Sequence, residues 1–355
     1  MKRAGIIEHS MPTIGLAEEK AVINVIRSKY LAEGDVVAKF ENELSRYIGC
    51  FGGVATGTGT QALHLALLSL GVSRGDEVVI PSYVCRAVLN AVLYTGAKPI
   101  LCDVNSKDYN MSFSEVKNKI SHRTKAIIVT HMYGCPAEVD KFKEYGIPII
   151  EDCAHSVGAE YEGRRVGGLG DLSIFSFEGT KYLVAGEGGM VLARNKYLFN
   201  KLQGLKEPDS LNNTVKYTYR MTNLQAAIAR VQLSRIGEFI KRRIEIAKMY
   251  ENSFARYAFE SPGKYQGKSH IFHRYMIKIK GNIHSFMKES YKKGIKVKQP
   301  VKPLPLYRYL KLSPKGFPNT EYIMKSAVSI PIYPTLTDRQ IGYIIKIMKE
   351  LLLRA

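Results

Sequence analysis

The sequence lacks any apolar run long enough to cross a bilayer. Residues 1–9 also lack the apolar core of a secretory signal. We therefore expect a cytoplasmic protein outside the membrane, and reduced thiols fit that compartment best. Cysteine is sparse, and the five cysteines have neither CxxC spacing nor a metal-finger pattern, so no bound metal is expected: Cys50, Cys85, Cys102, Cys135 and Cys153.

Acidic residues are also scarce, with 32 against 52 basic residues and a net charge of +20. Such a charge favours anionic partners through long-range attraction. The basic residues are spread along the chain, and their densest stretch, residues 292–302, alternates with apolar residues as a half-exposed strand does. A nucleic-acid partner is therefore not the favoured interpretation, and a small anionic substrate explains the sign of the charge equally well.

Short apolar segments alternate with helical or irregular stretches in the first half of the chain. This alternation predicts an α/β fold with a mostly parallel sheet and helices on both faces. Ligands of such sheets bind beyond the carboxyl ends of the strands, and Asp152 stands at one of those ends. The expected strands occupy residues 77–80, 100–104, 126–130, 147–151 and 172–177.

A chain of 355 residues exceeds the size of one typical core, so two domains are expected. We predict a large domain over residues 1–240 and a small C-terminal α/β domain over residues 241–355. A long helical pattern covers residues 221–250 and contains the expected boundary. After it we expect strands at residues 270–280 and 296–301, and helices at residues 285–293, 320–327 and 338–352.

Lys181 and Asp152 provide the most specific chemical signal. Lys181 follows the apolar strand pattern that ends at Ser176, and it precedes the glycine-rich run at residues 186–189. A lone lysine in a loop is usually solvated, but these flanks indicate that Lys181 points inward. An amine can bond covalently to an aldehyde cofactor, and a strand-end aspartate can keep a pyridinium nitrogen protonated. These are the two protein groups that pyridoxal 5'-phosphate (PLP) chemistry requires.

Three further elements fit the same cofactor. Gly59 and Thr60 open an apolar helix, where glycine and free N–H groups can bind a phosphate, although many such turns are only helix caps. Ser176 can add a hydroxyl to that phosphate site. His155 could donate to the oxygen beside the covalent link, or it could be a satisfied interior histidine; the sequence leaves both readings open.

Five motifs together resemble those of the DegT/DnrJ/EryC1/StrS family of sugar-nucleotide aminotransferases, which have the fold-type I aminotransferase architecture. The similarity continues through Arg220-Met-Thr-Asn-Leu-Gln-Ala-Ala-Ile228 to Ser329-Ile-Pro331, so it covers nearly the whole chain. The five motifs are Gly59-Thr-Gln-Ala-Leu63, Gly75-Asp-Glu-Val78 with Pro81-Ser82, Glu151-Asp-Cys-Ala-His155, Ser176-Phe-Glu-Gly-Thr-Lys181 and Gly186-Glu-Gly-Gly189.

The resemblance implies a role for each of these residues. Lys181 would hold PLP covalently, Asp152 would pair with the pyridinium nitrogen, and His155 would contact the phenolic oxygen. The phosphate would be held by Gly59, Thr60 and Ser176. Members of the family are homodimers with shared active sites, and they move an amino group from glutamate to a keto-sugar on a nucleoside diphosphate.

The sequence departs from the family pattern at several positions near the expected site. Cys85 stands where an aromatic residue often stacks on the cofactor, so either Tyr83 rearranges or the cofactor ring packs on a thiol. Thr218, two residues before Arg220, replaces an asparagine that often reaches the partner subunit's phosphate. A histidine-tyrosine pair near the sugar is replaced by residues 299–300. His273 matches a family position, where a substrate contact and a structural role are equally expected.

We therefore predict a PLP-dependent aminotransferase that uses glutamate and a nucleotide-linked keto-sugar, with Lys181 and Asp152 as catalytic residues. Thr218, Arg220 and His273 are candidate substrate-binding residues. One alternative is a PLP-dependent sugar 3-dehydratase, although such relatives carry histidine in place of Lys181. The other alternative is a regulatory or sensor protein that keeps the PLP fold, and the departures at Cys85 and Thr218 keep it open.

Overall fold

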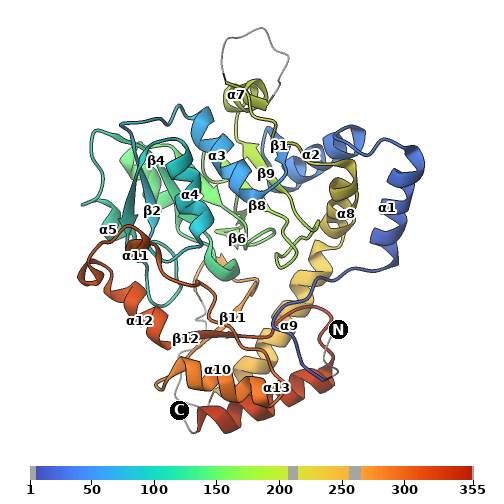
Figure 1. The fold of residues 1–355 in the computed structure, drawn as a ribbon, viewed down its shortest axis with the longest axis vertical. Coiled ribbons are helices and arrows are strands. Elements are labelled where there is room, and N and C mark those ends of the chain that lie inside the picture. Colours follow the sequence, from blue (N-terminus) through green and yellow to red (C-terminus); the bar gives the residue numbers. More distant parts are fainter. Residues whose placement is uncertain (1–4, 207–214, 256–264, 354–355) are drawn as a thin grey trace.

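The computed structural model describes residues 5–206, 215–255 and 265–353. A seven-stranded sheet with the order β1-β9-β8-β5-β4-β2-β3 forms its centre, and helices lie on both faces (Figure 1). The strands of this sheet are β1 (Gly52–Thr56), β2 (Glu77–Pro81), β3 (Lys98–Cys102), β4 (Thr124–Thr130), β5 (Ile149–Asp152), β8 (Leu172–Ser176) and β9 (Gly189–Ala193).

The predicted mostly parallel sheet is confirmed. Strands β3, β2, β4, β5 and β8 pair in parallel, and only β9 runs antiparallel to both of its neighbours in the sheet. The five predicted strands correspond to β2, β3, β4, β5 and β8. Sequence reasoning did not identify β9, because its first glycine was taken as part of the glycine-rich exit from the Lys181 loop.

Each face of the sheet carries its own apolar core. The strand residues alternate between the two cores, as Val78 and Val79 illustrate, because successive side chains of a strand point to opposite faces. One core contains residues of α2 (Asp35–Ile48) and α8 (Asn223–Ser234). The other contains residues of α3 (Gly59–Ser69), α4 (Arg86–Tyr94) and α7 (Lys196–Lys206).

A third core lies among the C-terminal elements, where β11 (Tyr275–Lys278) and β12 (Ala327–Ile330) form an antiparallel pair. Its helices are α9 (Ile236–Phe254), α10 (Ile283–Lys292) and α13 (Asp338–Leu352). The remaining elements are α1 (Leu16–Ser28), α5 (Phe113–Val116), α6 (Val139–Phe142), α11 (Leu306–Tyr309), α12 (Pro318–Ser326), β6 (Glu160–Tyr161), β7 (Arg164–Arg165), β10 (Lys268–Ser269) and the 3₁₀ helices η1 (Met132–Gly134), η2 (Lys143–Tyr145) and η3 (Pro314–Gly316).

Two expectations for the second half of the chain were wrong in detail. The single helix expected over residues 221–250 is divided at Arg235 into α8 and α9, because φ −102° and ψ 4° at that residue interrupt the helix. The strand expected over residues 296–301 is reduced to isolated bridges, of Ile295 with Ile7 and of Lys298 with Ser329. Alternating polar and apolar residues occur in any extended segment with one buried side. The pattern therefore did not require continuous hydrogen bonding to a neighbouring strand.

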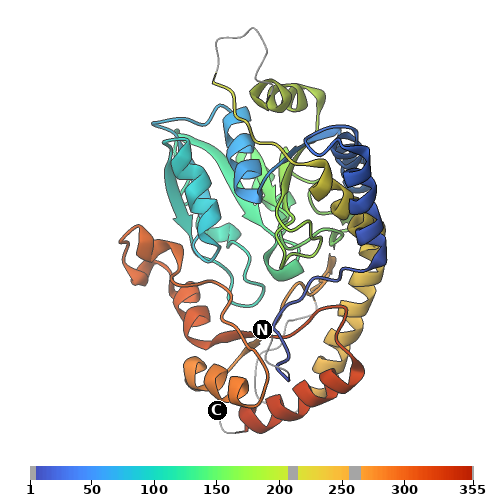
Figure 2. The same cartoon turned by 45° about the vertical axis from the view of Figure 1, so that its right-hand side comes forward.

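Helix α9 connects the sheet layers with the C-terminal elements (Figure 2). Its first turns, at Ile236 and Phe239, belong to a core of the sheet, whereas Ile246 and Tyr250 belong to the third core. The packing partner of α9 thus changes along its length, which agrees with a domain boundary near residue 240. That boundary stays a prediction. The N-terminal segment joins the third core as well, because Ile7 N donates to Gly294 O at 2.8 Å.

Candidate functional site

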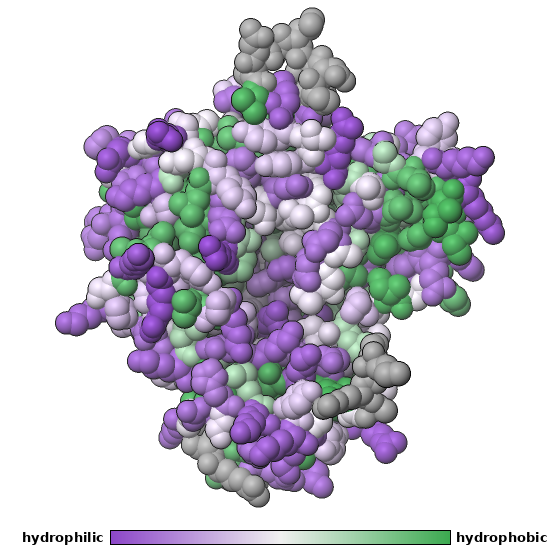
Figure 3. Space-filling view, in the orientation of Figure 1, coloured by the Kyte–Doolittle hydropathy of each residue, from purple (hydrophilic) through white to green (hydrophobic). Residues whose placement is uncertain are grey.

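The candidate site residues gather at the carboxyl edge of the central sheet. Asp152 ends β5, Ser176 ends the neighbouring strand β8, and the residues after β2 lead to Cys85. The surface is hollowed near the middle of the molecule, with hydrophilic side chains around the hollow (Figure 3). This is the position expected from the sequence for a ligand of a parallel sheet.

Lys181 lies in a loop that two backbone hydrogen bonds close. Phe177 N donates to Gly188 O at 2.9 Å, and Ala185 N donates to Phe177 O at 2.8 Å. Gly186 and Gly188 have φ values of 82° and 148°, which residues with a side chain rarely adopt. The glycine-rich run therefore allows the chain to turn back on itself and fixes the backbone from which the lysine projects.

The amine of Lys181 lies beside the imidazole of His155. The Lys181 Nζ to His155 Nε2 distance is 3.2 Å. The His155 ring stacks on Tyr133 and on His273, with centroid distances of 5.9 and 4.4 Å and interplanar angles of 14° and 16°. Burial, followed by the charge of Lys181, holds the pKa of His155 well below its usual value, so the ring is neutral at pH 7.

Tyr133 is a site residue that sequence reasoning missed. It has φ 57° and ψ 19°, a left-handed conformation that Gly134 follows with φ 88°. The Tyr133 hydroxyl donates to that of Tyr83 at 3.0 Å, and its ring supports His155. The glycine signals a turn after β4, but nothing in the pattern indicates which ring packs on the histidine.

His273 is buried, with 4% of its surface exposed, yet neither ring nitrogen has a hydrogen-bond partner among the described residues. Burial and the neighbouring His155 keep the pKa of His273 well below its usual value, so its ring is also neutral at pH 7. A buried polar group without a partner is costly unless a ligand or water supplies one. The substrate contact that the sequence left open for His273 therefore gains support from its surroundings.

Asp152 is a buried carboxylate without a cationic partner. Its side chain is 8% exposed, and Oδ1 accepts a hydrogen bond from Ala154 N at 3.0 Å. In the described part of the chain no basic side chain forms an ion pair with it. Burial raises the pKa of Asp152, whereas the Ala154 hydrogen bond and the charge of Lys181 act in the opposite direction. A cationic N–H of a ligand would satisfy this carboxylate.

The start of α3 forms a candidate phosphate cradle together with the end of β8. A Cβ built on Gly59 would lie 2.8 Å from Ser176 Cβ, and one on Gly189 would lie 2.4 Å from Thr58 O. Glycine at positions 59 and 189 therefore lets β8 and β9 approach the start of α3 closely. In a helix that begins at Gly59, the N–H groups of Gly59 and Thr60 have no intrahelical acceptor, so they and the Ser176 hydroxyl can bind an anion.

Cys85, and not Tyr83, faces the open side of the site. Tyr83 is 1% exposed and packs against Tyr133 and Tyr109, so in this structure it lies outside the stacking position. The Cys85 side chain is exposed, although protein atoms surround the recess where it lies and raise the pKa of its thiol. A neutral thiol is a small soft surface against which a cofactor ring can pack.

The structure does not join Thr218 and Arg220 to this cluster through their side chains. Both residues are exposed, and Thr218 makes no side-chain hydrogen bond within the described chain. The backbone of Arg220 lies next to the helix start, since a Cβ on Gly57 would be 3.2 Å from Arg220 O. The Arg220 side chain turns towards Glu33, at 3.9 Å. Any substrate contact of these two residues stays a prediction.

A second polar cluster, behind β5, could suggest a metal site, but its atoms are already engaged. Glu151 accepts hydrogen bonds at 2.6 to 2.8 Å from three backbone N–H groups of residues 167–170. His131 Nδ1 accepts from Ala137 N, so Nε2 carries the proton and donates to Glu151 at 3.0 Å. With both ring nitrogens occupied, His131 has no lone pair for a metal ion, and the nearby Cys153 does not change this.

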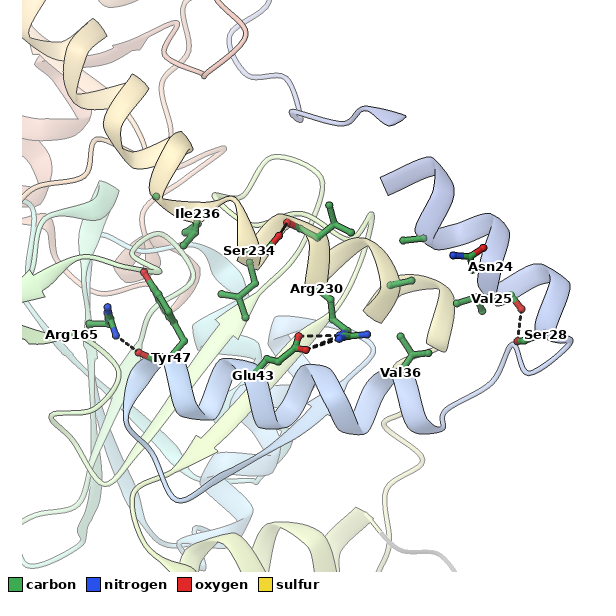
Figure 4. A pocket seen from close by; sticks show the side chains of 15 residues that line it. Asn24, Val25, Ser28, Val36, Glu43, Tyr47, Arg165, Arg230, Ser234 and Ile236 are labelled. Carbon is green, nitrogen blue, oxygen red and sulfur yellow. Dashed lines mark hydrogen bonds and ion pairs between the residues drawn. The ribbon is translucent and has the colours of Figure 1, made fainter. Parts of the chain in front are cut away.

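A groove of about 1000 Å³ lies outside the catalytic cluster, among α1, α2 and α8. Its charged side chains have partners within the chain (Figure 4): Arg230 Nε donates to the Glu43 carboxylate at 2.9 Å, and Arg165 Nη1 donates to the backbone carbonyl of Tyr47 at 2.6 Å. The rest of the lining is largely apolar. The groove thus lacks the unpaired polar groups that distinguish the site around Lys181.

Comparison with known proteins identifies the family. The profile described as the DegT/DnrJ/EryC1/StrS aminotransferase family matches residues 12–349. The chain belongs to this family. The family resemblance predicted from the motifs around Lys181 is therefore confirmed, and the α/β fold predicted with it is confirmed by solved structures of the same architecture.

Individual members of the aminotransferase family resemble the chain over most of its length. A GDP-perosamine synthase of Escherichia coli O157:H7 is 34% identical and covers 96% of each chain. A UDP-N-acetyl-3-dehydro-alpha-D-glucosamine 3-aminotransferase of Acidithiobacillus ferrooxidans is 32% identical and covers 88% of this chain and 87% of its own. A putative sugar aminotransferase of Streptococcus pneumoniae, solved in its PLP form, is 26% identical with a TM-score of 0.92 and covers 98% and 99% of the two chains.

The residues of this DegT/DnrJ/EryC1/StrS family member fit PLP. The buried carboxylate of Asp152 lacks a cation, the glycines at the start of α3 leave room for a phosphate, and the amine of Lys181 stands beside a neutral histidine. No helix in the described ranges is both long and apolar enough to pass through a bilayer.

Proposed function

We propose that the protein is a PLP-dependent aminotransferase that moves the amino group of glutamate to a keto-sugar linked to a nucleotide. The observation that carries this proposal is the arrangement of three residues. The Lys181 amine lies beside the neutral ring of His155, and the buried carboxylate of Asp152 nearby has no ion-pair partner in the described chain. When bound, PLP supplies an aldehyde that condenses with amines and a ring that accepts electrons from the adjacent carbon.

Lys181 has two tasks in this proposal. Its Nζ would hold the cofactor covalently, and as a free amine it would accept and return the proton of the amino donor's α-carbon. The closed loop at residues 177–188 fixes the backbone from which this amine projects. On the keto-sugar the same residues work in the reverse order.

Asp152 and His155 tune the site around that amine. The Asp152 carboxylate keeps a proton on the pyridine nitrogen, because the buried charge gains more from a cationic N–H than from water. His155, which Tyr133 supports from one side, would contact the phenolic oxygen, and the exposed Cys85 would pack against the ring. Gly59, Thr60 and Ser176 hold the phosphate.

The substrate class rests on the relatives and on charge. The two relatives described above are named for products or substrates that are GDP- or UDP-linked sugars. The net charge of +20 suits a diphosphate substrate and an acidic amino donor. His273 offers two unsatisfied ring nitrogens to polar groups of the sugar. We place the enzyme in the cytoplasm, since all five cysteines are free thiols, as a reducing compartment keeps them.

The direct test separates the two half-reactions. Purified protein with PLP is mixed with glutamate, and the absorbance change of the cofactor is followed; the aminated cofactor is then offered a panel of GDP- and UDP-linked keto-sugars. We expect conversion by glutamate and recovery with at least one sugar. A protein that binds PLP but shows no spectral change with glutamate would be a sensor and not an aminotransferase.

We further propose a homodimer, with a second copy of the chain covering the face formed by α1. Several large apolar side chains are exposed there, and they border the groove beside α2 and α8 (Figure 3). A contiguous apolar surface of this kind marks an interaction site. A partner subunit at this face also gives a role to the exposed side chains of Thr218 and Arg220, which the described chain does not join to their own site. The exposed residues are Ile14, Leu16, Ile23, Ile26, Tyr30 and Leu31.

The oligomeric state can be measured by light scattering during size-exclusion chromatography. We expect a mass of about twice 39.8 kDa for the wild type. Replacing two exposed residues of α1, in Leu16→Asp with Ile26→Asp, should shift the protein towards the monomer. The control for each single substitution is Leu353→Asp, which adds one aspartate at an exposed apolar residue beyond α13. A wild-type monomer would contradict the proposed dimer.

A further inference from the structure

Arg274 is a largely buried guanidinium that no carboxylate neutralises. It follows His273 and precedes β11. Its Nη1 lies 3.2 Å from His9 Nδ1 and 3.4 Å from His9 Nε2, and the described chain offers it no ion pair. Burial keeps the pKa of His9 well below its usual value, so this contact leaves the charge of Arg274 uncompensated.

Lys298 is a second unpaired cation in the same place. Its backbone pairs with Ser329, through Lys298 N to Ser329 O at 3.0 Å and Ser329 N to Lys298 O at 2.7 Å. The Ser329 hydroxyl contacts His9 Nε2 at 3.0 Å, and His9 in turn contacts Arg274. This chain of contacts connects the Arg274 guanidinium with the backbone of Lys298, and burial together with the charge of Arg274 lowers the pKa of the Lys298 amine.

The acidic groups whose charges act on these cations are engaged elsewhere. Glu178, in the Lys181 loop, accepts hydrogen bonds from the N–H and the hydroxyl of Thr180 at 3.1 and 2.6 Å. Glu8 pairs with Lys296 at 3.0 Å. Two like charges that lie together with no anion of their own repel each other, and such an arrangement is stabilised by a bound anion.

The pair also borders the catalytic cluster. Arg274 directly follows His273, whose ring stacks on His155 at a centroid distance of 4.4 Å, and His155 Nε2 lies 3.2 Å from Lys181 Nζ. The charge of Arg274 also contributes to the low pKa of His155. The same guanidinium acts on Tyr83 and Tyr133, the buried tyrosines beneath His155. An anion held by Arg274 would therefore belong to a molecule that also reaches the reacting amine.

We propose that Arg274 and Lys298, supported by His9 and Ser329, form a subsite for an oxyanion of a substrate. This proposal rests on the proposed aminotransferase function. The oxyanion is either the carboxylate of the amino donor or the diphosphate of the nucleotide sugar, since both present oxygens that a guanidinium and an ammonium bind. The two sources belong to different half-reactions, so kinetics distinguish them.

The experiment compares Arg274→Gln, Lys298→Gln and the conservative Arg274→Lys with the wild type, each loaded with PLP. The matched control is Lys293→Gln, which removes an equal charge from a lysine already paired with Glu350 at 3.2 Å. The two half-reactions are measured separately by stopped-flow absorbance. Calorimetric titrations with 2-oxoglutarate, GDP and UDP provide a readout that needs no turnover.

We expect the glutamine variants to raise the half-saturating concentration of one substrate about tenfold, while the maximum rate changes little. An effect on glutamate and 2-oxoglutarate would assign the subsite to the donor carboxylate. An effect on the keto-sugar and one free nucleotide would assign it to the diphosphate. An effect on both substrates would show that one subsite serves them in turn. In each case Arg274→Lys should retain part of the affinity.

The proposal is overturned if both glutamine variants bind and use both substrates as the Lys293→Gln control does. It is also overturned if loss of activity comes only with loss of bound PLP or a lowered melting temperature, because the two cations would then be structural. These outcomes differ from failure of the proposed function, in which the wild type itself gives no spectral change with glutamate.

Discussion

The two sides of β5 hold neighbouring carboxylates in opposite states. Behind the strand, Glu151 accepts hydrogen bonds from His131 and from three backbone N–H groups of residues 167–170. In front of it, Asp152 receives one backbone hydrogen bond and no cation. The alternation of side chains along a strand places these adjacent residues in two different environments.

The difference shows where the chain provides its own partners and where it leaves them to a ligand. Burial alone would raise the pKa of Glu151, but the hydrogen bonds from His131 and residues 167–170 outweigh it and lower that pKa. For Asp152 burial prevails, and the pKa is raised. The region behind β5 is thus a completed structural network, whereas the region in front of it is completed by a bound molecule.

The largest effect should come from Lys181→Ala, which removes the only lysine amine that reaches His155 in the described part of the chain. We expect loss of covalent PLP attachment and a fall in kcat of roughly a thousandfold or more. Absorbance of the bound cofactor and turnover with glutamate measure the two. The control is Lys293→Ala, which should behave as the wild type. Full activity of Lys181→Ala would break the assignment of the front of β5 as the catalytic side.

Asp152→Asn should have the next largest effect on kcat, because it keeps the shape of the side chain and removes its negative charge. We expect kcat to fall about a hundredfold. The cofactor-free protein should become more stable by about 1 kcal/mol at pH values above the raised pKa, since the ionised carboxylate then opposes folding. Urea unfolding between pH 2 and pH 8, without PLP, measures this. A destabilised Asp152→Asn protein would contradict the contrast drawn between the two carboxylates.

Glu151→Gln tests the other side of the strand. We expect a loss of about 2 kcal/mol of stability at pH 7, because a neutral amide cannot accept all of the hydrogen bonds that the carboxylate accepts. The lowered pKa predicts that wild-type Glu151 stabilises the fold above its unfolded pKa and that this contribution disappears as pH falls through the folded value. Urea unfolding over the same pH range should therefore show opposite slopes for the contributions of the two residues. Equal slopes would remove the distinction between them.

Breaking an exposed ion pair should have the smallest effect on stability. Arg242 Nη2 lies 2.7 Å from Asp338 Oδ1, and 77% of the Asp338 side chain is exposed. We expect Arg242→Gln to cost about 0.5 kcal/mol in urea unfolding and to leave turnover unchanged, since water screens the pair. A loss of stability as large as that of Glu151→Gln would show that burial does not determine how much these charges contribute to the free energy of unfolding.

Sequence reasoning succeeded where a local pattern has one physical outcome. Apolar runs such as residues 126–130 can only become buried strands of an α/β sheet, and the motif ending at Lys181 identified the family. It failed where partners come from distant segments. The stacking of Tyr133 on His155 and the contact of Arg274 with His9 depend on chain segments 22 and 265 residues apart, which no spacing rule can reveal.

The bridge between Ile7 and Ile295 sets a condition on how the molecule is made. Ile295 is synthesised 288 positions after Ile7. At ordinary translation rates this delay is roughly 15 to 60 seconds, during which the sheet layers can assemble but the third core cannot be completed. The segment around Ile7 therefore waits for its partner long after its own synthesis, and a nascent chain released early would expose that segment to proteases.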